Sequence, residues 1–341
     1  MKHPSGLETD FRLGSITLPH NILYAPLAGC SDYPFRLMSA KYRPGLMFCE
    51  MVKMEALLRN EQTISRMLDY DPAMRPIGGQ ICGSKPEFAG QAAKIVEELG
   101  FDVVDLNCGC PVDKVTKDGS GSGMLKNPSV IGDVIANMVA SVKIPVTVKI
   151  RAGWDDSSIN AAEITKIAEQ AGAVSICIHG RTREQGYKGP ANWDHIKACK
   201  EAATSIKVIG NGDLFSPEAV ARMFAHTKCD AVLVSRGTMG QPWIAQDIVN
   251  HLKGHAVAPR TFEERKEALW EHFQIVSKHY PERRAILTMR RVGCWYFKRS
   301  GNTKSFREQV SHAQDLSTIS TLIKNFTPSG PDEDLEEESD I

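Results

Sequence analysis

The sequence predicts an α/β fold: a (β/α)8 TIM barrel followed by a small all-helical domain. The length of 341 residues and the apolar content of 42% allow one large barrel with a sizeable core and an appended domain. Eight short apolar or β-branched runs alternate with helical patterns over roughly 240 residues, as expected for eight βα units. Beyond about residue 260 helical patterns alone continue, and they end near Phe326.

The eight runs lack strict alternation of apolar and polar residues, which favours parallel strands covered on both faces. They are Ile22–Ala25, Leu46–Cys49, Ile77–Cys82, Val103–Leu106, Val146–Ile150, Val174–Ile178, Lys207–Gly210 and Ala231–Ser235. A doubly wound open sheet is the main alternative. Such a sheet typically has a GxGxxG turn after its first strand, whereas the first run here is followed by Pro26-Leu27-Ala28-Gly29.

Several short motifs predict where helices begin. Ser84-Lys85-Pro86-Glu87 has the pattern of a capping box, and Asn127-Pro128 and Ser216-Pro217 each have the pattern of an N-cap followed by proline. Thr261 begins the first helix of the C-terminal region. We therefore expect a barrel over residues 1–255, a helical domain over 256–327 and a tail over 328–341.

The charge distribution is uneven, although 41 basic and 41 acidic residues balance overall. Seven acids and no Lys or Arg lie between Pro331 and Ile341, so residues 1–330 carry a net charge of +7. Such an acidic segment cannot bury apolar surface and is expected to be disordered. A solubilising tail is favoured over a regulatory mimic of nucleic acid.

The sequence carries no signal for secretion, membrane insertion or metal binding. The N-terminus has no apolar segment typical of a secretory signal, and no run is long enough to cross a membrane. The nine cysteines are scattered, and the Cys108/Cys110 pair has no second half that would complete a zinc site. We expect a monomeric cytoplasmic protein with reduced cysteines and without a metal.

Polar residues follow nearly every predicted strand. They are Glu50, Gln80, Asn107, Cys110, Lys149, Arg151, His179, Arg181, Arg183, Asn211-Gly212-Asp213 and Arg236-Gly237. Active sites of barrel enzymes lie at the carboxyl ends of the strands, so these side chains predict one site. Each could be incidental, since a lone histidine such as His179 is more often structural and Arg181 and Arg183 could be ordinary loop charges.

The segment Leu106-Asn107-Cys108-Gly109-Cys110-Pro111 is the most informative of these strand ends. It places a thiol, Cys110, at the start of a loop with glycines at positions 119, 121 and 123. An isolated cysteine is commonly an inert core residue, but loops carried on a rigid sheet often bear catalytic groups. We therefore expect Cys110 to be catalytic and its loop to close over a substrate.

The last two strand ends predict a phosphate site. Asn211-Gly212-Asp213 and Ser235-Arg236-Gly237 provide turns whose N–H groups can face an anion, together with a guanidinium. Lys149 and His179 add cationic or donor groups from neighbouring strands. Flavin mononucleotide (FMN) fits this pattern, because Lys149 can stabilise its anionic reduced form. The residues alone do not distinguish FMN from a phosphorylated substrate.

Five motifs together resemble the tRNA-dihydrouridine synthase family, bacterial type, over roughly residues 15–320. They are LNCGCP (106–111), KIRAGW (149–154), IHGRTREQGYKGPANW (178–193), NGD (211–213) and SRGTMGQPWI (235–244). The resemblance implies an FMN-dependent TIM barrel that reduces selected uridines of tRNA with NADPH (or NADH). It implies hydride transfer to C6 of the uracil and a proton from Cys110 to C5.

The resemblance also implies a role for each site residue. Pro26, Leu27 and Ala28 line the flavin, and Gln80, Lys149 and His179 contact its ring or ribityl phosphate arm. The ribityl chain and phosphate are held by Asn211, Gly212, Asp213, Ser235 and Arg236. Asn107 lies beside the uracil, and Arg181 and Arg183 face the RNA or the substrate. Ser235 departs from the family pattern, which commonly has glycine before this arginine.

The helical domain is expected to bind tRNA. Eight basic residues lie between Glu282 and Arg307: Arg283, Arg284, Arg290, Arg291, Lys298, Arg299, Lys304 and Arg307. The aromatic residues Trp295, Tyr296 and Phe297 lie among them and are expected in the helical core more than as stacking platforms. Two other functions stay open: an FMN barrel acting on a free pyrimidine or enone, and a non-catalytic RNA-binding protein.

Overall fold

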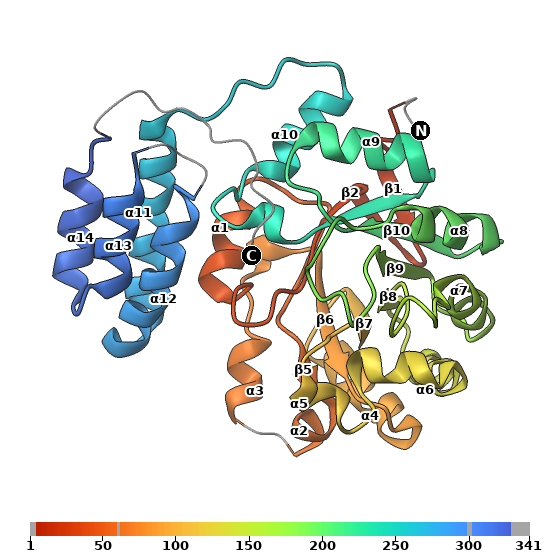
Figure 1. Ribbon diagram of the computed structural model, residues 1–341. Helices are drawn as coiled ribbons and strands as arrows, with labels where there is room; N and C mark the ends of the chain where they lie inside the picture. The colour runs from red at the N-terminus through yellow and green to blue at the C-terminus, as the bar shows by residue number, and fades with distance from the viewer. Residues whose placement is uncertain (1–4, 60–61, 299–301, 329–341) are drawn as a thin grey trace.

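The computed structural model describes residues 5–59, 62–298 and 302–328. Its centre is a closed barrel of parallel strands, drawn in Figure 1 with helices around it. Around the barrel the strands are β3 (Ile22–Tyr24), β4 (Leu46–Phe48), β6 (Ile77–Cys82), β7 (Val103–Cys108), β8 (Val146–Arg151), β9 (Ser175–His179), β10 (Lys207–Asn211) and β11 (Ala231–Val234). Pairing of β11 with β3 closes the ring. The predicted (β/α)8 barrel is therefore confirmed, and all eight strands lie at the expected runs.

Three further strands were not predicted. The strands β1 (Thr9–Leu13) and β2 (Ile16–His20) form an antiparallel hairpin around Gly14, whose φ of 60° suits the turn. Its buried side chains, among them Phe11, pack against residues that begin the barrel strands and cover the amino-terminal end of the barrel. The short strand β5 (Val52–Lys53) pairs with β6.

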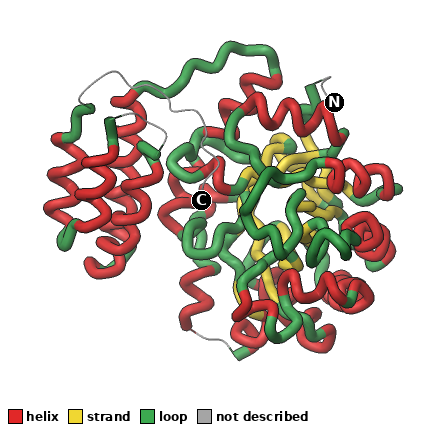
Figure 2. The backbone as a smooth tube through the Cα atoms, viewed as in Figure 1, coloured by secondary structure: helices red, strands yellow, loops and turns green. Residues whose placement is uncertain are grey.

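Helices surround the barrel, as Figure 2 shows in red around the yellow strands. They are α1 (Tyr33–Ala40), α2 (Met54–Leu58), α3 (Gln62–Met67), α4 (Pro86–Glu98), α5 (Asp113–Thr116), α6 (Pro128–Ser141), α7 (Ala161–Gln170), α8 (Asp194–Ala202), α9 (Pro217–Thr227) and α10 (Ile244–Leu252). Three 3-10 turns are η1 (Pro72–Met74), η2 (Gly121–Lys126) and η3 (Arg236–Thr238). The apolar faces of these helices pack on the outer faces of the strands and form the main core.

Two of the predicted helix starts are confirmed and two differ in detail. The Ser216 hydroxyl accepts from Ala219 N, and Thr261 forms a capping box with Glu264. Asn127 precedes Pro128 as expected, but its side chain makes no capping hydrogen bond. The capping box predicted at Ser84 is wrong: Lys85 is the N-cap of α4, and the Ser84 hydroxyl instead donates to the Asp118 carbonyl.

The C-terminal domain consists of α11 (Phe262–His279), α12 (Glu282–Trp295), α13 (Lys304–His312) and α14 (Leu316–Asn325). These helices share an apolar core that includes Tyr296 and Phe297, as expected for the aromatic residues of this segment. The domain lies beside the barrel against α1 (Figure 1). Tyr33 stacks on His279 with ring centroids 4.3 Å apart, and the Tyr280 hydroxyl donates to Asp32.

Two further findings concern membrane-spanning helices and metal sites. Within residues 5–59, 62–298 and 302–328, no helix combines the length and apolarity needed to cross a membrane. The same residues contain no cluster of three or more His, Cys, Asp or Glu side chains arranged to hold a metal ion. The predicted acidic tail lies outside the described residues, apart from Pro328.

Candidate active site

The strand register gathers the predicted polar residues at the carboxyl end of the barrel, called here the mouth. Five of them pair with one another across adjacent strands: Asn107 with Lys149, and His179 with both Arg151 and Asn211. Gln80 pairs with Asp105, which was not among the predicted residues. Because all eight strands are parallel, the same end of each contributes to this ring. The mouth is therefore one site built from β6 to β10.

Asn107 holds the backbone that carries Cys110. Its Oδ1 accepts from Cys110 N at 2.9 Å and from Gly109 N at 3.1 Å. The Cys110 carbonyl in turn accepts from the Ser122 amide and hydroxyl, at 3.1 and 2.9 Å. Cys110 is half-buried, whereas Cys108 on the same segment is fully buried. The thiol of Cys110 is thus held at the rim of the mouth, where a substrate can reach it.

The segment after Cys110 is more ordered than a glycine-rich loop predicts. It folds into α5 and η2, and glycines 119 and 121 adopt positive φ values of 81° and 58° between and within these turns. A Cβ added at Gly121 would lie 2.9 Å from the Cys110 carbonyl oxygen. These glycines close tight turns beneath the thiol, so their presence does not require a moving lid.

A buried acidic residue in the middle of β7, Asp105, lies beneath the mouth in the pocket inside the barrel. Asp105 is 4% exposed and accepts hydrogen bonds from Gln80 Nε2 at 2.7 Å and from the Thr147 hydroxyl. Burial raises the pKa of Asp105 to about 6, and its two hydrogen bonds and Lys149 oppose that rise. The signal was present in the sequence, because a carboxylate inside an apolar strand is costly unless it is bonded.

Lys149 and three arginines around His179 give the mouth a cationic character. Burial lowers the pKa of Lys149, and no acceptor among the described residues lies within hydrogen-bonding distance of its amino group. Burial also holds the pKa of His179 well below its usual range, aided by four facing cations: Lys149, Arg151, Arg181 and Arg236. The imidazole is therefore neutral at pH 7, and the surrounding charges favour an anionic ligand.

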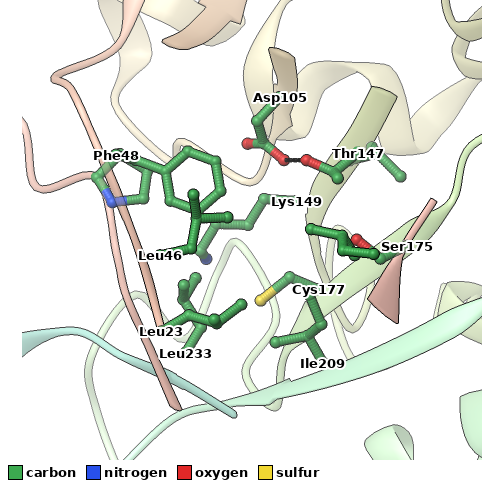
Figure 3. A pocket seen from close by; sticks show the side chains of 13 residues that line it. Leu23, Leu46, Phe48, Asp105, Thr147, Lys149, Ser175, Cys177, Ile209 and Leu233 are labelled. Atoms are coloured by element: carbon green, nitrogen blue, oxygen red, sulfur yellow. Dashed lines mark hydrogen bonds between the residues drawn. The ribbon is translucent and has the colours of Figure 1, made fainter. Parts of the chain in front are cut away.

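The pocket that continues from the mouth into the barrel has a polar wall and an apolar wall (Figure 3). Asp105, Thr147 and Lys149 lie on one side, and Ser175 and Cys177 come from the next strand. The other lining residues are Leu13, Leu23, Pro26, Leu46, Phe48, Val148, Ile209 and Leu233. Pro26 is therefore the one residue of the predicted Pro26-Leu27-Ala28 segment that reaches this pocket within the part of the chain described.

The turns after β10 and β11 contact each other. Asn211 Nδ2 donates to the Leu233 carbonyl at 2.6 Å and to the Ser235 hydroxyl at 2.9 Å. Gly212 has a φ of 120°, and a Cβ at that position would lie 2.7 Å from Ala191 and 3.0 Å from the His179 ring. Only glycine fits this approach, so the turn is packed tightly against His179. Arg236 lies over the Tyr187 ring at 4.4 Å.

Arg181 and Asp213 form an ion pair beside the mouth. Arg181 is 4% exposed, and its guanidinium bonds both carboxylate oxygens of Asp213, at 2.8 and 2.9 Å, and the Gly189 carbonyl. Asp213 also accepts from Ala191 N at 2.7 Å. Arg181 is thus buried in a fork-like pair that braces two loops, instead of facing outward, and the Asp213 carboxylate is already occupied.

Arg183 and Arg151 organise the loops around Cys110. Arg183 pairs with Asp113 of α5 and lies over the Trp154 ring at 4.5 Å, while Lys126 also lies over that ring at 3.6 Å. Arg151 is 2% exposed and donates to the carbonyls of Gly109, Thr182 and Gly186, at 3.0, 2.8 and 2.8 Å. Both arginines tie the Cys110 segment to the loop after β9.

The arrangement combines a thiol on a fixed backbone, a cationic pocket and two adjoining turns with an arginine, which suits a redox or addition reaction on an anionic cofactor or substrate. A family model described as dihydrouridine synthase matches residues 23–327. The probable tRNA-dihydrouridine synthase 1 of Synechocystis sp. is 37% identical over 90% of this chain and 86% of its own length. The tRNA-dihydrouridine synthase B of Pseudomonas aeruginosa is 34% identical over 92% of this chain and 95% of its own length.

Solved structures share the barrel at low sequence identity. Histamine dehydrogenase from Rhizobium sp. 4-9 has a TM-score of 0.56 and 14% identity, covering 78% of this chain and 50% of that one. The 6-hydroxypseudooxynicotine amine oxidase of Pseudomonas geniculata N1 has a TM-score of 0.56 and 13% identity, covering 74% and 51%. These two likenesses concern the fold. The family match over most of the chain and the curated relatives decide the assignment: this chain is an enzyme of the dihydrouridine synthase family.

Proposed function

We propose that this chain reduces the C5–C6 double bond of specific uridines in tRNA, with FMN as cofactor and NADPH (or NADH) as reductant. The observation that carries the proposal is the half-buried thiol of Cys110, held by Asn107 beside the cationic mouth. A protein that merely bound RNA would not need this combination. Membership of the family supplies the reaction class.

The residues of the mouth fit FMN. The amino group of Lys149 has Asp105 as a nearby charge but no hydrogen-bonded acceptor among the described residues, and a flavin ring can provide one. The Asn211–Asp213 and Ser235–Arg236 turns suit a phosphate, since they combine backbone N–H groups with a guanidinium. In this proposal Asp213 acts through its backbone and through Arg181, because its carboxylate is already bonded.

The remaining assignments follow the same geometry. Pro26, Leu27 and Ala28 line the flavin at the end of β3, and Gln80 and His179 offer it hydrogen-bonding groups. Asn107 lies between the cofactor pocket and Cys110, where it would also face the uracil. Arg183, paired with Asp113, would face the RNA, and the buried Arg181 would support the substrate side of the mouth through Asp213.

The chemistry divides between the cofactor and the chain. A bound flavin would supply the hydride that C6 of the uracil accepts, and it would take its electrons from the nicotinamide. C5 then needs a proton. We assign that proton to the Cys110 thiol, a role typically worth ~10²–10⁴-fold in rate.

The helical domain, residues 256–327, would bind the tRNA while the barrel, residues 1–255, carries out the reduction. Arg283, Arg284, Arg291 and Lys304 are exposed on α12 and α13. Arg291 also borders the mouth, because its guanidinium lies 3.9 Å from the position that a Cβ at Gly29 would occupy. A uridine in folded tRNA must leave its stack to reach the mouth, so binding would depend on the shape of the tRNA.

The test uses purified protein loaded with FMN and tRNA transcribed without modification. We expect dihydrouridine to appear on addition of NADPH, detected by mass spectrometry of the digested tRNA, and free uracil to remain unchanged. Reduction of free uracil with no product in tRNA would favour the alternative of a pyrimidine reductase. Protein that takes up no flavin would reject both enzymatic functions.

A further inference from the structure

A continuous chain of hydrogen bonds connects the buried Asp105 to the backbone of Cys110. The Asp105 carboxylate accepts from Gln80 Nε2 at 2.7 Å, and Gln80 Oε1 accepts from Asn107 Nδ2 at 2.8 Å. Asn107 Oδ1 then accepts from Cys110 N at 2.9 Å. The Thr147 hydroxyl donates to the second carboxylate oxygen, which fixes the far end of the chain.

The direction of this chain depends on Asp105. An ionised carboxylate can only accept, so Gln80 must turn its NH2 group toward Asp105 and its carbonyl toward Asn107. Asn107 must then present its NH2 group to Gln80, which leaves its carbonyl for the Cys110 amide. The two ends of an amide have nearly the same shape, so without a fixed acceptor both side chains could turn over.

The surroundings of Asp105 keep it dry but ionised at neutral pH. Leu23, Leu46 and Leu233 line the apolar wall of the same pocket (Figure 3). The ionisable groups that face Asp105 are Lys149 on β8, Cys177 on β9 and Cys108 on β7. Burial raises the pKa of Asp105 to about 6, so near pH 7 the acceptor form dominates.

A buried carboxylate in this pocket is costly for stability. An apolar residue of similar size is often neutral or stabilising at such a position. Both described donors to the carboxylate are protein side chains, Gln80 and Thr147. The hydrogen bonds through Gln80 and Asn107 are therefore the described connection from Asp105 to Cys110.

We propose that Asp105 is a positioning residue for the uridine reduction proposed above: it orients the Gln80 and Asn107 amides and thereby holds the backbone of Cys110. Cys110 touches the substrate in this scheme, and Asp105 acts through two intervening side chains. Asp105→Leu removes the acceptor. Asp105→Asn keeps an acceptor for Gln80, because the carbonyl of the new amide can accept the hydrogen bond from Gln80 Nε2. The NH2 group of the new amide then faces the Thr147 hydroxyl.

The experiment compares these two variants with Ser39→Ala on α1, outside the pocket. This substitution removes a buried hydroxyl that has no hydrogen-bond partner in the described structure. Three quantities are measured in the full chain. They are the iodoacetamide alkylation rate of the Cys110 peptide in flavin-free protein, the hydrogen exchange of the Gly109 and Cys110 amides, and kcat and KM with unmodified tRNA and FMN-loaded enzyme.

We expect Asp105→Leu to change the alkylation rate and accelerate exchange at Cys110 by about tenfold, and to lower kcat about tenfold with KM for tRNA unchanged, as for a small misplacement of a catalytic group. Asp105→Asn should stay within about threefold of wild type, and Ser39→Ala should match wild type. Exchange in α7 should be unchanged in all variants, since a general loss of structure would accelerate it too.

Two results would overturn the inference. One is an Asp105→Leu protein with wild-type exchange and alkylation at Cys110, and the other is equal impairment of the Leu and Asn variants. If Asp105→Leu does not fold, Asp105→Ala takes its place, because it removes the same acceptor for Gln80. It should accelerate exchange at Cys110 by a similar factor, and wild-type exchange in that variant would overturn the inference. The exchange and alkylation measurements need neither flavin nor tRNA, so they test this inference even if the proposed reaction fails.

Discussion

The two ends of the barrel are built from the same strands but have opposite characters. At the amino-terminal end, Phe11, Leu13 and Leu18 of the hairpin pack on apolar residues that begin the strands. At the mouth, the same strands end in amides, cations and the loop that carries Cys110. Strand β8 makes the change over six residues, from Val146 to Arg151.

The difference teaches that stability and chemistry are separated along the barrel axis. The hairpin end contributes burial of apolar surface, which is insensitive to ligand. The mouth holds buried cations and a buried carboxylate that lower stability unless they are paired. Substitutions at the amino-terminal end should therefore change the free energy of unfolding, and substitutions at the mouth should change flavin binding and the reaction rate.

The largest effect is expected at the mouth. Cys110→Ala should lower the rate of dihydrouridine formation by ~10²–10⁴-fold, because it removes the proposed proton donor. The flavin absorbance and the melting temperature should stay close to wild type, since the thiol makes no described contact that holds the fold. Cys30→Ala is the matched control, a second half-buried thiol at a strand-end loop. Loss of flavin together with activity would instead mean that Cys110 is structural.

The next largest effect is expected at the opposite end. Phe11 is fully buried in the hairpin cluster, so Phe11→Ala should lower the free energy of unfolding by about 3–5 kcal/mol. The dissociation constant for FMN and the KM for tRNA should not change in the protein that remains folded. Denaturant unfolding measures the free energy of unfolding. The control is Ile16→Ala, at a half-exposed position of the same hairpin. A Phe11 variant with altered flavin affinity would break the separation.

Much of this organisation follows from sequence, because parallel strands bring their carboxyl ends to one edge. That rule is enough to group Gln80, Asn107, Lys149 and His179 from the order of the strands alone. It does not reveal Asp105, although a carboxylate within an apolar run is itself a signal. The reason is that its function depends on hydrogen bonds to Gln80 and Thr147 on neighbouring strands.

Other features depended on tertiary contacts that local patterns do not carry. The loop position of Arg181 predicts exposure, but its long side chain turns inward to Asp213. Glycines 119 and 121 indicate flexibility, yet they close turns of α5 and η2. The hairpin was missed, although Gly14 joins two short alternating runs there. Arg290 is similar: it donates to the Ala313 carbonyl at 2.7 Å and braces the helical domain.

The pH dependence of the free energy of unfolding should show what the buried Asp105 carboxylate costs in stability. Its pKa in the folded protein, about 6, lies above its usual value of 3.8. The folded state therefore binds the proton of Asp105 more tightly than the unfolded state does. Its contribution to the free energy of unfolding is fully present below about pH 4 and is lost as pH rises through about 6. Asp105→Asn should remove this loss and raise the unfolding free energy at pH 8 by about 2–3 kcal/mol.

Unfolding curves at pH 5 and pH 8 measure this difference. The gain of Asp105→Asn over wild type should be larger at pH 8 than at pH 5, because wild-type Asp105 is mostly protonated at the lower pH. An equal difference at both values would mean that the pKa of Asp105 is not raised in the folded protein.

Lys149 and Lys207 are a matched pair of lysines at the two ends of the barrel. Lys149→Gln at the mouth should raise the dissociation constant for FMN about ten- to a hundredfold, as expected for loss of a hydrogen bond to a charged group. Lys207→Gln at the start of β10 is the control, because Lys207 lies near Phe11 at the other end of the barrel. Fluorescence titration of flavin-free protein measures both. Equal effects would remove Lys149 from the cofactor pocket.

The smallest effect is expected outside the barrel, on the helical domain. Arg283 is exposed near the start of α12 and makes no hydrogen bond or ion pair with a described residue, so Arg283→Glu should leave stability and flavin binding unchanged. It should weaken tRNA binding severalfold. The slope of the logarithm of the binding constant against the logarithm of the salt concentration should become shallower by about one, because one fewer counterion is released from the tRNA. Lys166→Glu on α7, which lies across the barrel from this domain (Figure 1), provides the same charge change elsewhere. Titrations of tRNA at several salt concentrations compare the two variants. If both weaken binding equally, the helical domain contributes only net charge, and the contacts that select the uridine lie around the mouth itself.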